Sequence, residues 1–444
     1  MEYTILVTPV SLSLTLVMGV LLLLLERKYA PIPLLIVACY VTLDQKIYVA
    51  LMGFTMLRIM LIFGFVRVLI KEEYRGIELT TLDKLFIAWV ISFVFFYTIL
   101  HWNYKAFNFK MGLAYDAIGV YFLARCLIKD SGDIIKFYKN LSLVILPLAI
   151  FMVIESISNW NIFSMLTGVP FVGEVRGGFV RSQGSFSHPI LAGSFGAALM
   201  PVFIALWFQK DSVQRYAILG CIAATVITVS SHSVGPLMAY FVGLVGMLMW
   251  HIRFRMRIVR WGIAVFLLTA HMLMNAPVWF LFARLSGLTG GGGWHRSQLI
   301  NQTVLRFNEW WLYGTKYTAH WMVGLNPKNP DMIDITNWFV SQAVHGGIIT
   351  LLFFIVIIVA CYKIIGNKIA SFDEQGSSNE ILIWSLGVSV TAHATSFISV
   401  SYFDKIVVFW YILIAAISLF QTKYFFNQAT CDSTDHHENA WYMK

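Results

Sequence analysis

The chain has 444 residues, of which 58% are hydrophobic and only 12% are charged. Soluble domains typically contain about 45–50% apolar and about 25% charged residues, so this composition excludes an ordinary soluble protein and indicates a lipid bilayer as its solvent. The formal net charge of +9 does not indicate nucleic acid, because the charges lie mostly in short loops between apolar segments. Such loops orient a membrane protein, since basic loops are retained in the cytoplasm.

A helix needs roughly 20 mainly apolar residues to cross the hydrocarbon, and such runs recur from Thr4 almost to Thr422. We therefore predict an all-α polytopic membrane protein with about 12–13 transmembrane helices, in which residues 1–444 form a single integral membrane domain. The first run lacks a basic leading segment and a small-residue cleavage site, so we expect a retained helix rather than a signal peptide. The predicted spans are 4–25, 30–43, 47–70, 84–100, 113–129, 138–158, 188–209, 216–231, 236–251, 261–275, 338–362, 382–400 and 405–421.

The loop 252–260 decides the predicted orientation, because its four arginines place it in the cytoplasm. Alternation of the spans then puts the tail 423–444 inside and the amino terminus outside, although span 30–43 is short and could be re-entrant. The cytoplasmic connections carry 15 Lys and Arg residues. The short outer loops carry only Lys46, Lys105 and Lys110. We expect a multi-pass membrane protein.

Two outer segments, 159–187 and 276–337, are too long to be simple connections, and long loops in compact domains are usually functional. They break the positive-inside trend, because they hold seven cations and fewer acids. The cations are Arg176, Arg181, Arg284, Arg296, Arg306, Lys316 and Lys328, and the acids are Glu174, Glu309, Asp331 and Asp334. We read the run of four glycines at 290–293 as a hinge, since no GK[ST] sequence follows it.

In the first outer segment, Arg176 and Arg181 stand among glycines just before a predicted membrane helix. Two guanidinium groups can hold an anion such as a pyrophosphate, and the helix that follows Pro189 would add the positive end of its dipole. The alternative is that both arginines contact lipid head groups. His188 is either a capping residue or a proton-transfer group.

In the second outer segment, Trp294 and Arg296 precede a stretch rich in aromatic residues. Aromatic rings stack on the apolar faces of sugars and suit a lipid interface equally well, so both interpretations stay open. Arg296 is a second candidate for binding an anionic leaving group. No cysteine lies in a CxxC or Cys/His metal-binding pattern, and we expect neither a metal nor another cofactor.

Ionisable residues inside the apolar segments also need partners. Arg58 and Asp116 lie in such segments, where charged groups usually face the bundle interior and pair, so we predict an ion pair between them. The segment Ser230 to Ser233 lies at an outer helix end. It either caps that helix or contacts a glycan.

Several of these features together resemble the superfamily of O-antigen ligases and O-antigen polymerases. The likeness rests on a multi-span start, the segment Arg181-Ser182-Gln183-Gly184-Ser185-Phe186-Ser187-His188-Pro189, a large late outer loop with Arg296-xxx-Ile300, and Thr336-Asn337-Trp338 leading to His345-Gly346-Gly347. It spans roughly 113–421. The likeness lies in the order of these motifs together with the topology, and it implies a multi-pass protein of the bacterial inner membrane.

The resemblance implies a metal-independent inverting glycosyltransferase of the membrane-embedded C type. Its donor would be glycan linked to undecaprenyl pyrophosphate at the periplasmic face, and its other partners the bilayer and polysaccharide-export proteins. The family arginines that hold the pyrophosphate would fall on Arg181 (or Arg176) and Arg296. His188, Trp294 and Asn337 would contact the substrate.

The chain departs from the family at one position. Where the family often has His-Asn at the end of the large loop, this chain has Thr336-Asn337, so the acceptor-activating histidine is missing. Asp334 is our first candidate to replace it, and Asp331, His320 and His345 are others. The hydroxyl also needs no strong base once the leaving group is neutralised.

The competing hypothesis is a transporter, such as a polysaccharide flippase. A flippase should show paired halves with matching interrupted helices and a charged central cavity, whereas here the polar residues gather in two outer segments of unequal length. The sequence therefore favours the enzyme. Such an enzyme would either polymerise or ligate its glycan, depending on the acceptor.

Overall fold

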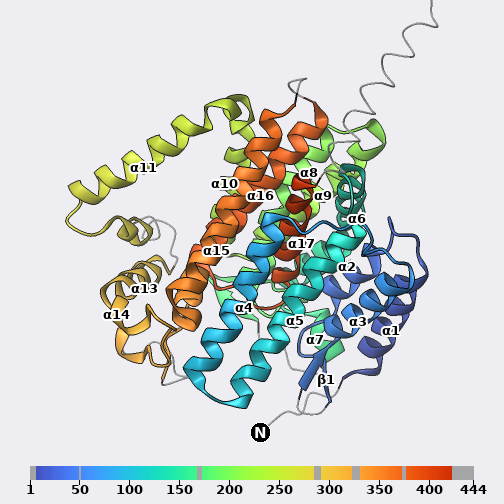
Figure 1. The fold of residues 1–444 in the computed structure, drawn as a ribbon, viewed down its shortest axis with the longest axis horizontal. Coiled ribbons are helices and arrows are strands. Elements are labelled where there is room, and N and C mark those ends of the chain that lie inside the picture. The colour runs from blue at the N-terminus through green and yellow to red at the C-terminus, as the bar shows by residue number, and fades with distance from the viewer. Residues whose placement is uncertain are drawn as a thin grey trace, which may run out of the picture.

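The fold was analysed in a computed structural model, which describes residues 7–49, 52–167, 173–284, 292–322, 331–372 and 377–422. The described chain is mostly helical (Figure 1). Its long helices are α1 (Pro9–Leu24), α2 (Pro31–Tyr40), α3 (Met56–Ile70), α4 (Thr81–His101), α5 (Tyr104–Leu127), α6 (Ser131–Ser158), α8 (Pro189–Trp207), α9 (Asp211–Ser230), α10 (Val234–Leu248), α11 (Met256–Leu273), α15 (Trp338–Ala370), α16 (Ser378–Ser399) and α17 (Ile406–Ser418).

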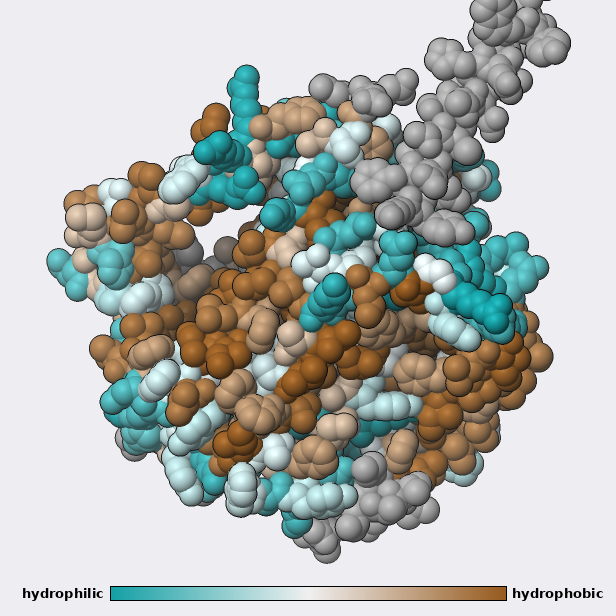
Figure 2. All heavy atoms as spheres, viewed as in Figure 1, coloured by the Kyte–Doolittle hydropathy of each residue, from teal (hydrophilic) through white to brown (hydrophobic). Residues whose placement is uncertain are grey.

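These helices give the chain the character of a multi-pass membrane protein. Within the described residues, seven helical stretches are long and apolar enough to cross a bilayer, and shorter apolar helices lie at 9–24, 31–40 and 406–421. Figure 2 shows hydrophobic side chains gathered across the middle of one face, with hydrophilic residues mostly toward its upper and lower ends. Each predicted span contains a helix in the structure.

The core of the bundle is built around α8 and α17, which lie among the other helices in Figure 1. Nearly every residue of α8 is buried, and so are most residues of α17. Helix α8 packs against α9, α10 and α16, while α17 packs mainly against α5. These two helices are therefore shielded from lipid by their neighbours.

Polar contacts at one end of the bundle agree with the predicted alternation of the spans. Arg67 of α3 donates to the carbonyls of Leu22 and Leu25 at the end of α1, both at 2.6 Å. Arg253, which follows α10, donates at 3.1 Å to the buried Glu380 of α16. Each contact thus joins two helix ends that the sequence assigned to the same side, the cytoplasm.

The predicted span 47–70 is wrong in its first part. Residues Lys46–Val49 (β1) and Met52–Thr55 (β2) form an antiparallel hairpin, and the helix begins only at Met56. Thr55 ends the strand because its hydroxyl caps the helix by accepting from the Arg58 N–H at 3.3 Å. Helix α2 has 10 residues, about 15 Å at 1.5 Å per residue, so it cannot by itself cross a bilayer core of about 30 Å.

Helix α11 leaves the bundle. It projects away from the other helices in Figure 1, none of its residues is buried, and it touches mainly its own flanking segments. Its exposed side chains include Trp261, Phe266 and Leu268. In a bilayer, lipid would cover such a face.

Both long outer segments are structured where they are described. The first contains α7 (Ile162–Thr167) and an antiparallel hairpin of β3 (Glu174–Arg176) and β4 (Phe179–Arg181). The second contains η2 (Val278–Phe280), α13 (Gly293–Leu305), α14 (Phe307–Trp310) and η3 (Ala319–Trp321). The tail 423–444 and the glycines 290–291 lie outside the described residues.

The second segment is bound to α15 by backbone hydrogen bonds. The Ile348 N–H donates to Trp311 O, and the Thr315 N–H donates to Val344 O, both at 2.8 Å. Helix α15 opens for this contact at Gly347, whose φ is 67°. A Cβ there would lie 2.5 Å from the Leu312 carbonyl oxygen, so only glycine fits.

The first prediction concerns sidedness. In a background whose native cysteines are replaced, Val175→Cys on the exposed β3 hairpin should react with an impermeant maleimide added to intact cells. Ser212 is exposed at the start of α9, on the side that the sequence assigned to the cytoplasm. Ser212→Cys should therefore react only after lysis. The reverse pattern, measured by mass shift of the labelled protein, would invert the predicted orientation.

Candidate functional site

The loop after β4 is anchored by a buried carboxylate. Glu155, near the end of α6, is 1% exposed, and its two oxygens accept from the Gln183 and Gly184 N–H groups, each at 2.9 Å. The Ser182 N–H donates to Ser230 O at 3.0 Å. These contacts satisfy backbone groups that an irregular buried loop would otherwise leave unpaired.

A second anchor is formed by two adjacent buried residues, Asp404 and Lys405, just before α17. The Ser187 N–H donates to Asp404 Oδ2 at 2.6 Å, and Lys405 Nζ donates to Ser185 Oγ at 2.7 Å. Burial lowers the pKa of Lys405 to about 8 and raises the pKa of Asp404 above its usual range. The pair ties the loop 181–189 to the central helix of the bundle.

Arg181 stands at the start of this loop, and its side chain is almost fully buried. It is 1% exposed. One terminal nitrogen lies 2.5 Å from Glu174 Oε2, and the other donates to Ser233 Oγ at 2.7 Å. Its Nε has no hydrogen-bond partner among the described residues. Burial lowers the pKa of Arg181 from its usual value, while the Glu174 carboxylate opposes that change.

His188 lies next to this ion pair and caps α8. Its Nδ1 accepts from the Ile190 N–H at 3.1 Å, and its Nε2 lies 3.8 Å from Glu174 Oε2. The pKa of His188 is lowered chiefly by burial and then by the charge of Arg181. The imidazole is therefore held neutral, with Nδ1 committed to the cap and Nε2 directed toward the carboxylate.

Arg296 reaches the same place from the second outer segment. It lies on α13, where its Nε donates to Ser399 O at the end of α16, at 3.2 Å. Burial lowers the pKa of Arg296, and the charges of Arg176 and Arg181 lower it further. No carboxylate of the described residues lies within ion-pair distance of Arg296. The structure thus gathers three arginines, 176, 181 and 296, at one end of the bundle, which we call the arginine face.

The other predicted site residues differ in their placement. Asp334 is exposed, and its charge acts on His188, so it borders the arginine face. Trp294 is 58% exposed on α13. Asn337 is 2% exposed, with Oδ1 accepting from the Val340 N–H at 3.1 Å and Nδ2 donating to Ile398 O at 3.4 Å. The Asn337 amide therefore caps α15, which is a structural role.

Two of the histidines considered as replacements lie elsewhere. His320 is within 2.9 Å of Glu309 in the second outer segment. His345 lies on α15 beside Tyr97 of α4. No hydrogen bond, ion pair or ring contact joins either histidine to Arg181 or Arg296 within the described residues. Asp331 accepts from the Thr318 and Ala319 N–H groups through its backbone carbonyl in the second outer segment. Asp334 is the candidate whose charge acts on His188, beside Arg181.

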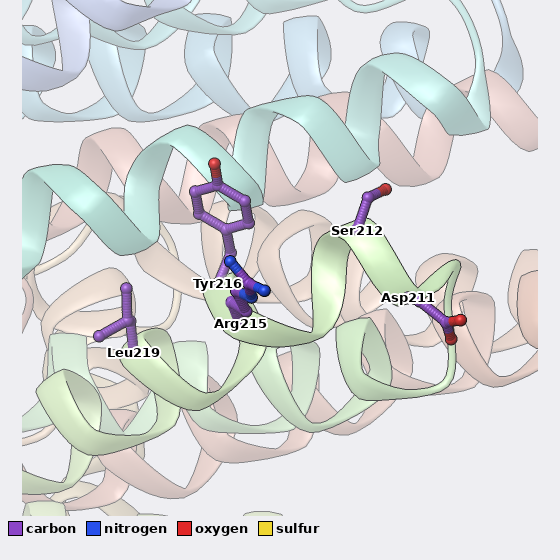
Figure 3. A pocket seen from close by; sticks show the side chains of 5 residues that line it. All are labelled: Asp211, Ser212, Arg215, Tyr216 and Leu219. Carbon is purple, nitrogen blue, oxygen red and sulfur yellow. The ribbon is translucent and has the colours of Figure 1, made fainter.

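A separate shallow hollow lies at the other end of α9. Figure 3 shows its lining side chains on that one helix, Asp211, Ser212, Arg215, Tyr216 and Leu219. Ser230 and the arginine face lie at the far end of α9, roughly 30 Å away for a helix of this length. The hollow is therefore no part of the candidate site.

No protein-family model, curated protein or solved structure matches the chain. The fold and its apolar helices define the class, a mostly helical, multi-pass membrane protein.

Sequence reasoning missed four acidic or basic residues of this site. Glu174, Glu155, Asp404 and Lys405 each bind the loop 181–189 or its arginine. Only Glu174 and Lys405 stood out in the sequence. Glu174 is an acid among cations, and Lys405 is a lysine at the start of an apolar run.

The second prediction tests the buried anchor. Lys405→Met should lower the stability of the detergent-purified protein by about 1.5–3 kcal/mol, because it removes the charge-assisted hydrogen bond to Ser185. It also removes a positive charge that acts on the buried Asp404 carboxylate. The double variant Lys405→Met/Asp404→Asn should recover much of this loss. Thermal unfolding would measure both, and a single variant as stable as the parent would contradict the anchoring role.

Proposed function

We propose that this protein is a membrane glycosyltransferase that polymerises or ligates glycan units carried on undecaprenyl pyrophosphate. The protein would act at the periplasmic face, in exopolysaccharide or O-antigen biosynthesis. The observation that carries it is the convergence of Arg181 and Arg296 from two separate outer segments. The sequence likeness to the ligase and polymerase superfamily supports the same conclusion.

The arginine face has the chemistry of an oxyanion site. Guanidinium groups bind carboxylates and phosphates through paired N–H donors. Arg181 already holds a carboxylate, that of Glu174, which is 48% exposed. Among the described residues, the one hydrogen-bond partner of Arg296 is the Ser399 carbonyl, so its guanidinium would be available to a ligand. The start of α8 beside His188 adds a positive helix end.

In the proposed reaction, an acceptor hydroxyl attacks the anomeric carbon of the donor from the face opposite the pyrophosphate. The bond between that carbon and the phosphate oxygen breaks, and the oxygen departs with the electron pair. Arg181 and Arg296 would stabilise the negative charge that develops there. Asp334 would accept the hydroxyl proton, with the bordering Trp294 against the sugar. Neutral His188 would position the loop rather than act as a base.

The third prediction tests the two arginines with purified protein and lipid-linked repeat units. Arg181→Ala or Arg296→Ala should lower glycan transfer by about ten- to a hundredfold, because each removes a charge-assisted hydrogen bond worth about 1.5–3 kcal/mol. Arg→Lys should lose most of the activity, since ammonium lacks the planar fork. Arg284→Ala, an exposed arginine of the same outer segment, is the matched control.

Products of this assay distinguish the alternatives. Longer lipid-linked chains indicate a polymerase, and transfer to another acceptor indicates a ligase. Unchanged donor that crosses vesicles would favour a transporter. Full transfer activity in the double variant Arg181→Ala/Arg296→Ala would rule out the proposed role of these residues.

The fourth prediction concerns Glu174, whose carboxylate occupies the Arg181 fork in the ligand-free protein. A pyrophosphate must displace it, so the competent state is only partly populated and the observed affinity is reduced. Glu174→Gln should therefore lower the KM for the donor. The kcat should stay near the parent value, and a large fall in kcat would instead assign Glu174 to proton transfer.

A further inference from the structure

A second group of cationic and titratable side chains lies away from Arg181 and Arg296, around Tyr97 of α4. The His101 ring centroid is 4.2 Å from that of Tyr97, and the His345 centroid is 5.8 Å from it. The Lys110 ammonium lies 4.3 Å from the Tyr97 centroid. Lys316, from the second outer segment, lies close enough to act on the charge of His101. We call the four residues around Tyr97, namely His101, Lys110, Lys316 and His345, the Tyr97 cluster.

The cluster is assembled from four separate segments of the chain. His101 ends α4, Lys110 lies on α5, His345 lies on α15, and Lys316 comes from the loop that is hydrogen-bonded into α15. The charges that act on His101 and His345 come from within the cluster. Arg181 and Arg296 are not among them, so this is a second location.

Lys110 has aromatic rings around it and no carboxylate. Its ammonium lies 5.5 Å from the Phe93 centroid and 5.9 Å from the Phe109 centroid, and no ion pair joins it to an acid of the described residues. His345 Nδ1 binds Ser341 O at 2.9 Å, which leaves Nε2 without a partner in the described chain. Elsewhere in the bundle, arginines pair with acids, as Arg58 does with Asp116 and Arg67 with Glu73.

Lys110 and Lys316 both act on His101. Gathering positive charge without an acid of the described residues costs electrostatic energy unless an anion joins it. Lys105, five positions earlier on the same helix, is exposed, which shows how a lysine at this helix end reaches water. Lys110 instead stays half-buried under the rings. Aromatic faces beside cations suit a ligand that carries both a ring or sugar face and an oxyanion.

We propose that the Tyr97 cluster is an oxyanion-binding site, separate from the arginine face, that takes the carboxylate or phosphate of a glycan or the phosphate of a lipid head group. This second binding site is additional to the proposed transferase activity and does not depend on that activity. The shared chemistry is an anionic oxygen held by Lys110 and its neighbours.

The test uses the full chain in phosphatidylcholine nanodiscs, with Arg181→Ala/Arg296→Ala removing the first site. Equilibrium dialysis would measure binding of labelled inorganic phosphate and of glucuronate. Native mass spectrometry would measure retention of added phosphatidylglycerol. Lys110→Met should weaken binding of the occupying anion at least about tenfold, the effect of losing one charge-assisted bond. Lys105→Met, the same charge loss on the same helix, should leave it unchanged, and Lys110→Arg should retain it.

Each outcome is decisive. Binding of phosphate or glucuronate that depends on Lys110 supports the site and assigns a glycan anion. Retention of phosphatidylglycerol that depends on Lys110, without binding of the small anions, supports the site and assigns a lipid head group. Equal effects of Lys110→Met and Lys105→Met on all three anions would overturn the proposal. Because transfer activity is not the readout, failure here is distinct from failure of the transferase hypothesis.

Discussion

The free-energy cost of moving charged side chains out of water determines which residues pair in this membrane protein. An arginine in a helix bundle is tolerated when a carboxylate or carbonyl satisfies its guanidinium. Arg58 binds both oxygens of Asp116 at 2.8 and 2.7 Å, and Arg67 binds both oxygens of Glu73 at 2.9 and 2.7 Å. Arg58–Asp116 joins α3 to α5, so such pairs fix which helices are neighbours as well as neutralising charge.

The arginine face departs from that rule in a way that points to a ligand. Arg181 is as buried as Arg67, yet its acid is a half-exposed hairpin residue rather than a buried helix residue. Arg296 has no acid at all among the described residues. The loop that presents Arg181 is nevertheless rigidly held by Glu155 and Lys405. A rigid scaffold around an exchangeable counterion is what anion binding requires.

Hydropathy alone located the helices, because a bilayer demands long apolar runs and hydrogen-bonded backbone. The Arg58–Asp116 pair was predicted on the same grounds and is confirmed. Local patterns could not reveal the hairpin at 46–55, since its residues are as apolar as a helix. Nor could they reveal Asp404 and Lys405 as partners of residues 185 and 187, because that pairing is set only by how the helices pack.

Helix α15 connects these features physically. Its first turn is capped by Asn337, and its break at Gly347 admits the backbone of residues 311–315. The segment that carries Lys316 is thereby fixed to the helix that carries His345, while α13, with Arg296, packs against the same helix. A side chain at Gly347 would push residues 311–315 away from α15. It would thereby disturb both the arginine face and the Tyr97 cluster. Gly347, in the motif that runs from Thr336 to Gly347, thus has a structural role.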